Sequence, residues 1–275
     1  MSATPINRMA LGQKSEYLSH YSPELLFPIA RKPKRDEIAV PSPLRFYGYD
    51  RWNAYEVSWL NLSGKPQVAI AEFDVPCDSP FIVESKSLKL YLISCYQTKF
   101  ADIHALKATL EKDLSASTGA PVIVNLRPPK EFTQALLVNL PGTCIDELPV
   151  TTDIYEPNPD FLTAQGSITT ETLHSHLLKS NCLVTNQPDW ASLFVEYTGP
   201  QIDHEGLLKY LISFRLHNEF HEQCVERIFM DIQRRCHPTS LTVYACYTRR
   251  GGLDINPIRS TDAKSTISPI RLVRQ

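Results

Sequence analysis

The chain has 275 residues, 43% of them hydrophobic, and a formal net charge of −2 at pH 7. This length and apolar content suffice for one large domain or two ordinary domains with buried cores. The near-neutral charge argues against direct nucleic-acid binding, because holding a phosphate backbone requires a basic surface. No apolar run approaches the ~20 residues that span a bilayer, and the first residues lack the apolar core of a signal peptide, so we expect a cytoplasmic protein without membrane contact.

The main basic cluster is RKPKR at residues 31–35. A proline interrupts it, so we interpret it as a solvated turn and not as a targeting signal. The seven cysteines form no CxxC pair. In a reducing compartment this indicates free thiols, most of them small core residues.

The first predicted elements are two strands, YEVSWLNL at 55–62 and QVAIAEFDV at 67–75, which show strand-like alternation. A helix is predicted over LKLYLIS at 88–94. A second helix is predicted over ADIHALKATLEKDLS at 101–115, with Asp102 as its N-cap. A β-rich run, PVIVNL, follows.

The second half of the chain repeats this order. Residues shared by the two copies are Pro80, Ile82, Tyr91, Leu92, Ile93 and Ser94, which recur as Pro200, Ile202, Tyr210, Leu211, Ile212 and Ser213. Strand-like segments precede the second copy at 172–178 and 191–197, and another follows it at 241–247. We therefore predict an α+β protein of two tandem modules, each an antiparallel sheet with a pair of helices on one face.

The repeat also gives domain boundaries. We expect an N-terminal extension over 1–45, a first module over 46–143 and a second over 166–275. The acidic, proline-bearing segment 144–165 is the expected linker. The apolar stripes of the helices correspond between the two copies, whereas the polar residues differ. This difference favours a composite site to which each copy contributes different groups. Neutral sequence divergence after the duplication would leave the same pattern.

The polar stretch ESKSLK at 84–89 begins the first helix of copy one. Ser85, Lys86 and Ser87 would lie where unpaired N–H groups and the helix dipole attract an anion, and this set suits a phosphate. The alternative is capping by Ser85 or Ser87 beside a solvated lysine. The stretch TRRGG at 248–252 ends a strand with two guanidinium groups and two flexible residues, which suits a phosphate or is simply a turn.

A second candidate site surrounds Cys182, which follows a strand and has polar neighbours in NCLVTNQPDW. It therefore looks less like a core thiol than the other six cysteines. A nucleophilic cysteine needs a stabilised thiolate and a group that handles the proton, and Asp189 is placed for the second task.

The stretch HNEFHEQC places His217, His221 and Cys224 at i, i+4 and i+7 of a predicted helix face. That spacing could hold zinc; a buried cysteine with two solvent-reaching histidines is the commoner outcome. Glu222, just off that face, offers a carboxylate for two adjacent N–H groups of a heterocycle.

Four separated stretches then carry a family resemblance: ESKSLKLY, NCLVTNQPDW, FHE at 220–222 and YTRRGGLDINPIRS at 247–260. From about residue 15 onward the chain is similar to the QueF family of NADPH-dependent 7-cyano-7-deazaguanine reductases, in its long two-module form. The resemblance implies two tunnelling-fold (T-fold) modules, assembly into a homodimer, and a small-molecule deazapurine substrate. It also implies four-electron reduction of a nitrile to an amine in queuosine biosynthesis, with two NADPH and no metal.

The same resemblance implies residue roles. The catalytic residues would be Cys182, which adds to the nitrile carbon as a thioimide, Asp189, which protonates the nitrogen, and His221, a later proton donor. Substrate-binding residues would be Val83, Glu84, Ser85, His221 and Glu222. The NADPH phosphates would be held by Ser85, Lys86, Arg250 and Gly251. A missing GxGxxG fingerprint does not count against this, since the family binds NADPH outside a Rossmann domain.

Two alternatives stay open from the residues. One is a zinc-dependent pterin-type T-fold enzyme using His217, His221 and Cys224, which would purify with stoichiometric metal. The other is a non-catalytic purine-binding module, which would bind the base without oxidising NADPH.

Overall fold

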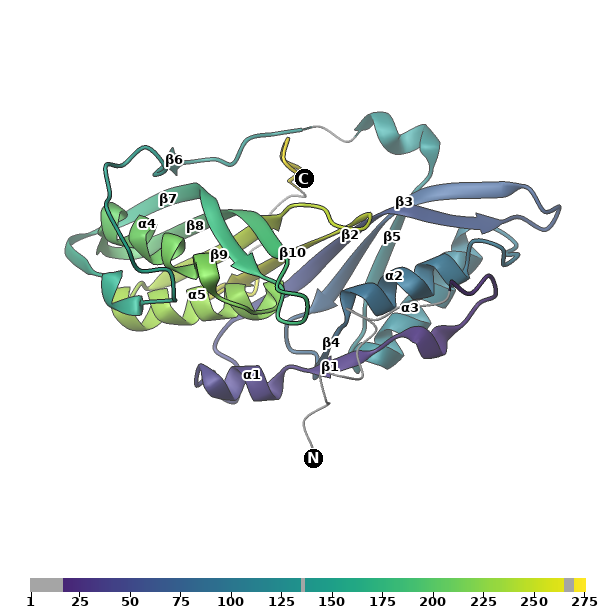
Figure 1. The fold of residues 1–275 in the computed structure, drawn as a ribbon, viewed down its shortest axis with the longest axis horizontal. Helices are drawn as coiled ribbons and strands as arrows, with labels where there is room; N and C mark the ends of the chain where they lie inside the picture. The colour runs from purple at the N-terminus through teal and green to yellow at the C-terminus, as the bar shows by residue number, and fades with distance from the viewer. Residues whose placement is uncertain (1–16, 135–136, 265–269) are drawn as a thin grey trace. The chain divides into compact units, whose positions relative to one another are not determined.

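The computed structural model describes residues 17–134, 137–264 and 270–275 (Figure 1). The chain divides into two compact units. Unit 1 takes its described residues from 1–36, 49–136 and 249–255, and unit 2 takes its own from 37–48, 137–248 and 256–275. Neither unit is one continuous stretch, because the segment 37–48 belongs to unit 2 and the segment 249–255 belongs to unit 1.

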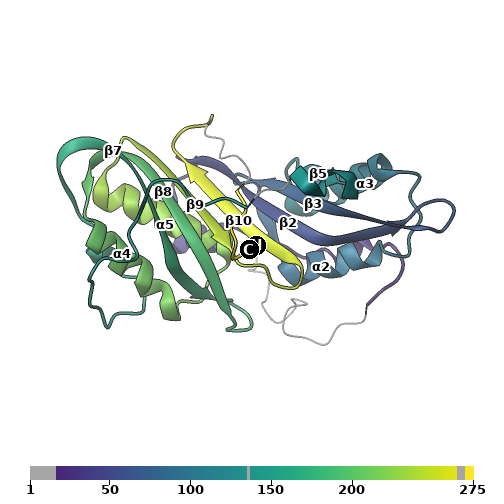
Figure 2. The same ribbon diagram turned by 90° about the horizontal axis from the view of Figure 1, so that it is seen from above.

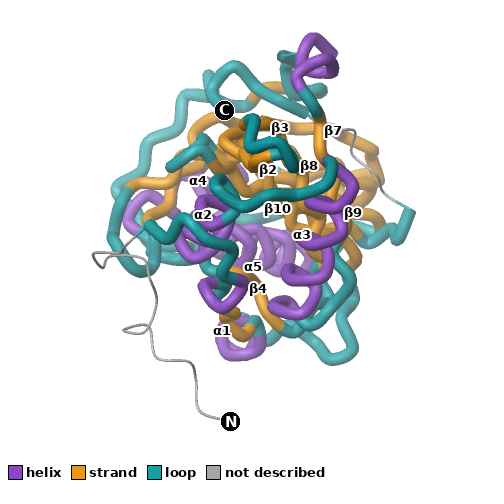
Figure 3. The backbone as a smooth tube through the Cα atoms, turned by 90° about the vertical axis from the view of Figure 1, so that its right-hand side faces the viewer, coloured by secondary structure: helices purple, strands orange, loops and turns teal. Residues whose placement is uncertain are grey.

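Unit 1 contains a three-stranded antiparallel arrangement in the order β5-β3-β2, and a small pair of β1 with β4. Its elements are η2 (Pro23–Leu25), β1 (Pro28–Ala30), α1 (Lys32–Glu37), β2 (Tyr47–Leu60), β3 (Pro66–Pro76), β4 (Phe81–Val83), α2 (Ser85–Ser94), α3 (Ile103–Thr118), β5 (Ile123–Arg127) and η3 (Pro129–Gln134). In Figure 3, α2 and α3 lie below β2 and β3.

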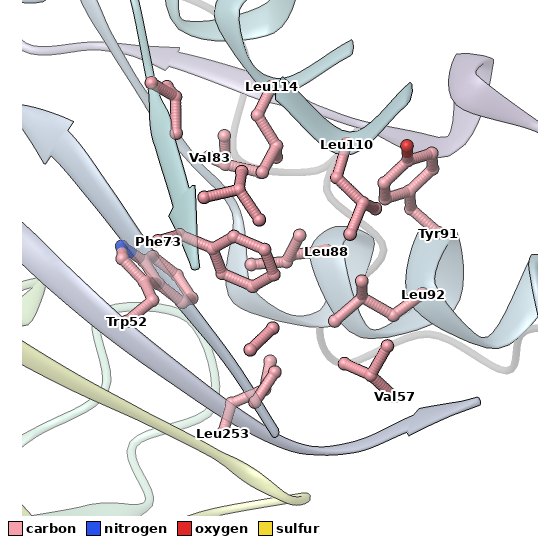
Figure 4. Packing of buried hydrophobic residues seen from close by; sticks show 14 of the residues in the cluster. Trp52, Val57, Phe73, Val83, Leu88, Tyr91, Leu92, Leu110, Leu114 and Leu253 are labelled. Atoms are coloured by element: carbon pink, nitrogen blue, oxygen red, sulfur yellow. The ribbon is translucent and has the colours of Figure 1, made fainter. Parts of the chain in front are cut away.

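The core of unit 1 forms between these helices and strands. Leu106, Leu110 and Leu114 recur every four residues along α3, so they share one helix face, and all are buried. Figure 4 shows Phe73 of β3 directed at Leu88 of α2 and at this α3 face. The apolar stripe predicted from the sequence is therefore what attaches the helix pair to the sheet.

Unit 2 is built on a long antiparallel hairpin of β7 and β8, extended by β9 and β10 on one side and by β6, parallel to β7, on the other. Figures 1 and 2 show its two helices, α4 and α5, side by side on one face of these strands. Its elements are β6 (Thr143–Cys144), η4 (Pro159–Phe161), β7 (Ala164–Asn181), β8 (Pro188–Ile202), α4 (His204–Ser213), η5 (Phe214–Leu216), α5 (His221–Cys236), β9 (Ser240–Tyr247) and β10 (Leu253–Ser260).

The duplication extends to individual hydrogen bonds between the paired helices. The Tyr91 hydroxyl donates to Asp113 Oδ2 at 2.6 Å, and the Tyr210 hydroxyl donates to Asp231 Oδ2 at 2.7 Å. Ser94 and Ser213 each donate to the carbonyl three residues earlier. The predicted fold class, α+β with two tandem modules that each have a helix pair on one face of antiparallel strands, is confirmed.

The basic cluster at residues 31–35 is not the solvated turn that we expected. Residues from Lys32 form α1, whose first turn tolerates Pro33 because the missing N–H has no helical partner there. The Arg31 guanidinium is 2% exposed and donates to Asp50 Oδ2 at 2.5 Å and to Ser79 Oγ at 3.1 Å. None of the helices in the described part of the chain has the length and apolar character needed to cross a membrane.

Candidate functional site

The loop that carries Cys182 is a tight connection between β7, which ends at Asn181, and β8, which begins at Pro188. The Cys182 N–H donates to the Gln187 carbonyl at 2.8 Å, and the Asn186 N–H donates to the Cys182 carbonyl at 3.0 Å. Asn186 has a φ of +56°, a left-handed conformation that asparagine adopts more readily than most residues. The polar residues noted in the sequence therefore build the loop itself.

Residues 217–219 hold this loop from one side. The Asn181 N–H donates to the His217 carbonyl at 2.7 Å, and the Glu219 N–H donates to the Asn181 carbonyl at 3.1 Å. The Asn218 side-chain amide donates to the Cys182 carbonyl at 3.2 Å and to Asn186 Oδ1 at 2.9 Å. This segment leads directly into α5, so it fixes the cysteine loop relative to the start of that helix.

Glu219 anchors the same segment to α5. Its carboxylate is 1% exposed and accepts two hydrogen bonds from Arg227, at 3.0 and 2.8 Å, and one from His217 Nε2 at 3.0 Å. Burial alone would raise the pKa of Glu219, but the bonds from His217 and Arg227 outweigh it and the pKa is lowered. The carboxylate therefore stays ionised within a satisfied buried network. Sequence reasoning missed Asn218 and Glu219, whose only signal was their place beside two histidines.

Asp189 and His221 lie in contact. His221 Nε2 is 3.3 Å from Asp189 Oδ2, and the carboxylate residue is 6% exposed. The His221 ring stacks on Tyr247, with centroids 3.7 Å apart and an interplanar angle of 5°. Within the described chain, His221 Nδ1 is buried without a hydrogen-bond partner. The stacking fixes the ring, and the acidic partner makes the pair suited to moving a proton.

Cys182 lies at the end of the hairpin that carries Asp189. Asp189 pairs with Ser180 across the strands, and Cys182 is the first residue of the connecting loop, two positions after Ser180. The expectation that Cys182 would look less like a core thiol is wrong by burial, since it is 3% exposed and Cys144 is the exposed cysteine. Cys182 differs from the other cysteines in its hydrogen-bonded loop and in the polar residues that surround it in the sequence.

The structure does not support the zinc-ligand spacing considered for His217, His221 and Cys224. Helix α5 begins at His221, and His217 is extended with a ψ of 137°, so the three residues do not share a helix face. Cys224 is fully buried, and burial raises the pKa of its thiol to about 12. Among the described residues they do not form a group with metal-ligand distances.

Glu222 occupies the first turn of α5 and is 2% exposed. The N-cap residue of this helix is Phe220, which makes no side-chain capping bond. A carboxylate at this position is stabilised by the positive end of the helix dipole. Burial of a carboxylate at a helix start that lacks a side-chain cap is compatible with recognition of a ligand N–H edge.

In unit 1 the beginning of α2 confirms the predicted position of Ser85, Lys86 and Ser87, but the capping residue is Glu84. Its carboxylate accepts from the Lys86 N–H and the Ser87 N–H, each at 2.8 Å, and is 1% exposed. Burial raises the pKa of Glu84, opposed by these two bonds and by the charges of Lys86 and Arg250. Both cations therefore lie within electrostatic reach of this carboxylate.

Capping by Glu84 argues against the predicted binding of a phosphate by the N–H groups at the start of α2. Two of those groups are taken by Glu84, so the protein's own carboxylate is the anion at this terminus. Ser87 Oγ donates to the Glu84 carbonyl at 2.7 Å and accepts from the Phe27 N–H at 3.0 Å, so it is structural. A phosphate here would depend on the side chains of Ser85, Lys86 and Arg250.

The remaining predicted residues of unit 1 differ in accessibility. Val83 is a core residue of β4, 5% exposed, so only its backbone can meet a ligand. Lys89, the second lysine of the opening stretch, is paired with Glu56. Arg249 lies over the Tyr55 ring, with 3.9 Å between the guanidinium carbon and the ring centroid.

The TRRGG stretch forms a tight turn in which the Arg250 N–H donates to the Leu253 carbonyl at 2.8 Å. Gly251 and Gly252 both have positive φ, +62° and +78°, as a two-residue hairpin turn requires. A Cβ on Gly252 would lie 2.6 Å from the Glu56 carboxylate carbon, whereas one on Gly251 would meet nothing within 4 Å. The backbone at Gly251 is therefore open to a ligand.

Comparison with known proteins gives two family matches. Residues 17–126 match a family described as nitrile reductase, 7-cyano-7-deazaguanine-reductase N-term, and residues 188–266 match one described as QueF-like protein. A protein of Legionella pneumophila (strain Lens) is 55% identical over 98% of this chain and 95% of its own length. One from Chromobacterium violaceum is 55% identical over 100% and 99%, and one from Ralstonia nicotianae is 60% identical over 91% and 92%. All three are named NADPH-dependent 7-cyano-7-deazaguanine reductase.

Proposed function

The chain belongs to the family of NADPH-dependent 7-cyano-7-deazaguanine reductases, and from this premise we propose that it reduces the nitrile of 7-cyano-7-deazaguanine to an aminomethyl group, in the queuosine pathway of tRNA modification. The observation that carries the proposal is the grouping of the Cys182 loop with the Asp189–His221 pair in unit 2. The reaction needs four electrons, and NADPH, when bound, supplies a hydride in each of two steps.

Cys182 acts as the nucleophile. Its sulfur forms a bond to the nitrile carbon while the nitrogen takes up a proton, which gives a thioimide attached to the chain. After the first reduction of that carbon, the carbon–sulfur bond breaks, the thiolate leaves and an imine remains. Reduction of the imine with uptake of a further proton yields the amine, so the cysteine is regenerated.

Asp189 and His221 manage the protons. Asp189 protonates the nitrile nitrogen as the thiolate adds, because it stands at the start of β8, where the loop that carries Cys182 ends. His221 contacts Asp189 through Nε2, so it can return a proton to that carboxylate or deliver one at the imine stage. Its stacking on Tyr247 holds the ring in one orientation through both steps.

The residues proposed to bind the substrate include one buried carboxylate in each unit, Glu222 and Glu84. Glu222 accepts hydrogen bonds from adjacent ring N–H groups of the deazaguanine, with His221 beside it. Glu84 uses two of its roughly four acceptor positions for the helix cap, which leaves capacity for a ligand N–H. Ser85 and the backbone of Val83 are the other unit 1 groups proposed to bind the substrate.

The NADPH phosphates fit the cations of unit 1. Lys86 and Arg250 both act on Glu84 electrostatically, and the open backbone at Gly251 follows Arg250 in the chain. Ser85 would add a hydroxyl donor. Two cations with a hydroxyl and an accessible backbone form a reasonable diphosphate site.

The remaining expectations are kept as part of the proposal. They are a homodimer, no direct nucleic-acid partner, a cytoplasmic location, and the division into an extension (1–45), a first module (46–143), a linker (144–165) and a second module (166–275).

The test is to mix the purified chain with 7-cyano-7-deazaguanine and follow NADPH absorbance. We expect two NADPH consumed per nitrile, an aminomethyl product, and, with NADPH omitted, a mass increase of one substrate molecule on the peptide that contains Cys182. Binding of the base without NADPH oxidation would support the purine-binding alternative and reject the reductase.

A further inference from the structure

A cysteine and two histidines meet at an edge of unit 2, and none of them has a role in the proposed reaction. β6 runs parallel to β7 with Cys144 opposite His174. His176 follows His174 by two residues, and the centroids of the two rings are 5.4 Å apart. One potential ligand atom from each of the three residues lies within 4.8 Å of the other two.

Both histidine rings are oriented by a hydrogen bond at Nδ1. His174 Nδ1 lies 3.0 Å from the Pro141 carbonyl oxygen, and His176 Nδ1 lies 2.8 Å from Ser192 Oγ. A carbonyl oxygen can only accept, so His174 carries its proton on Nδ1 and keeps a lone pair on Nε2. Metal-binding histidines are typically held in this way, with the second nitrogen bonded to the protein.

The electrostatic surroundings favour a cation. Two acidic residues, Asp146 and Glu147, follow Cys144 by two and three positions. Negative charge this close in the chain favours a bound cation. The Asp146 carboxylate also accepts from Ser175 Oγ at 2.6 Å and from the His176 N–H at 3.0 Å, which fastens the segment after β6 onto β7.

We propose that Cys144, His174 and His176 bind one zinc-class divalent metal ion, with water in the fourth position. On binding, the Cys144 thiol releases its proton to solvent and a sulfur–metal bond forms. Zinc bonds of about 2.0–2.3 Å place tetrahedral ligands about 3.5 Å apart, so ligand atoms as far as 4.8 Å apart would have to approach by up to roughly 1 Å. Cys144 is exposed and has room for this movement. The ion would tie β6 to β7.

Cobalt tests the site because a bound thiolate gives Co²⁺ a near-ultraviolet charge-transfer band. The full chain is stripped with a chelator and titrated with Co²⁺. We expect one equivalent to bind with that band, and Zn²⁺ to displace it. Cys144→Ser should lose the band, and His174→Asn should weaken cobalt binding at least about 10-fold. Ser192→Ala, which releases only the His176 ring, should weaken it by about 10-fold and keep the band.

Two controls locate the signal. Cys182→Ala should keep the band, and so should His237→Asn, which changes an exposed histidine of the same unit at a left-handed position that asparagine accepts. Zn²⁺ should raise the thermal unfolding midpoint of the wild-type chain and not that of Cys144→Ser. A titration without a stoichiometric band, a band that persists in Cys144→Ser, or one lost in Cys182→Ala would each overturn the proposal.

Discussion

The two units differ most at the beginnings of their helices. In unit 1 the buried carboxylate is Glu84, at the first helix, and the second helix has an ordinary exposed cap, Asp102. In unit 2 the first helix has the exposed cap, Asp203, and the buried carboxylate is Glu222, at the second helix. Burying a carboxylate costs free energy that an exposed capping residue does not cost, so a role beyond capping is expected for Glu84 and Glu222. The buried carboxylate is at the first helix in unit 1 and at the second helix in unit 2.

The framework beneath those positions has not diverged. The Tyr91–Asp113 and Tyr210–Asp231 hydrogen bonds connect equivalent helices with nearly equal lengths. Duplication has thus preserved the contacts that hold the helix pairs together and changed the groups that the helix ends present. Substitutions in diverged groups should affect the reaction, whereas substitutions in shared groups should affect stability in both units.

The largest effect is expected at Cys182, which has no counterpart in unit 1. Cys182→Ala should lower nitrile reduction by at least about 10³-fold, because the covalent step is lost, and should still bind the base. Intact mass without NADPH would show no adduct. Cys224→Ala removes another unit 2 thiol and should retain the adduct. An adduct on the Cys182 variant would exclude this thiol as the nucleophile.

The cations of unit 1 should affect the cofactor. Lys86→Ala and Arg250→Ala each remove a charged hydrogen-bond donor, worth ~1.5–3 kcal/mol, and should raise the KM for NADPH by about 10- to 150-fold. Adduct formation with the nitrile should be unchanged. Lys209→Ala, on the first helix of unit 2, is the matched control and should leave this KM as it was. Normal KM values in both unit 1 variants would move the phosphate site elsewhere.

Neighbouring residues at the start of α5 should separate binding from chemistry. Glu222→Ala leaves ring N–H donors unpaired and should weaken base binding by about 1–3 kcal/mol in calorimetry. His221→Ala should bind and form the adduct with near-normal affinity, then consume NADPH slowly in a single turnover. The reverse pattern, with His221→Ala unable to bind, would contradict these assignments.

The shared Tyr–Asp bonds should contribute to stability in both units, and Asp113 of unit 1 also accepts from the Tyr21 hydroxyl at 2.6 Å. Tyr91→Phe and Tyr210→Phe each remove a hydroxyl that donates to a carboxylate, and each should lower the free energy of unfolding by about 1–3 kcal/mol. Urea denaturation measures this, and the KM for NADPH should not change in either variant. A loss confined to one unit would show that the duplicated framework is not energetically equivalent.

The smallest effects are expected at the exposed caps. Asp102→Ala and Asp203→Ala each remove one side-chain bond to a first-turn N–H, at Ala105 and Gly206 respectively. Each should lower stability by about 1 kcal/mol in urea denaturation, with reduction of the nitrile unaffected. A catalytic defect in Asp203→Ala would mean that the exposed caps also take part in function.

The sequence predicted the helices well because their starts and stripes are local. Asp102 caps Ala105 N–H as expected, and the repeated YLIS motif placed the first helices of both copies. Features that depend on distant partners were missed. Arg31 is buried only because Asp50 and Ser79 meet it in space, and Asn218 supports Cys182 across 36 positions of chain.

The other wrong predictions concern residues whose local sequence fits more than one structure. Glu84, Ser85 and Ser87 can all cap a helix, and choosing among them requires the burial of Glu84, which the sequence does not contain. His217 fits a helical spacing with His221, but its carbonyl pairs with Asn181, which holds it in an extended conformation until the helix begins. The roles assigned to Cys182, Asp189, Glu222, Lys86 and Arg250 stay predictions until the variants are measured.

The hydrogen bonds around Cys182 have an entropic consequence. A cysteine on a loose loop would have to give up backbone freedom, on the order of 1–2 kcal/mol per residue, each time it met its substrate. Here Asn181, Cys182 and Asn186 are fixed by bonds to one another and to residues 217–219, so that ordering is completed once, when the chain folds. The thiol meets every incoming nitrile from one preset position, and binding energy remains available for orienting the substrate.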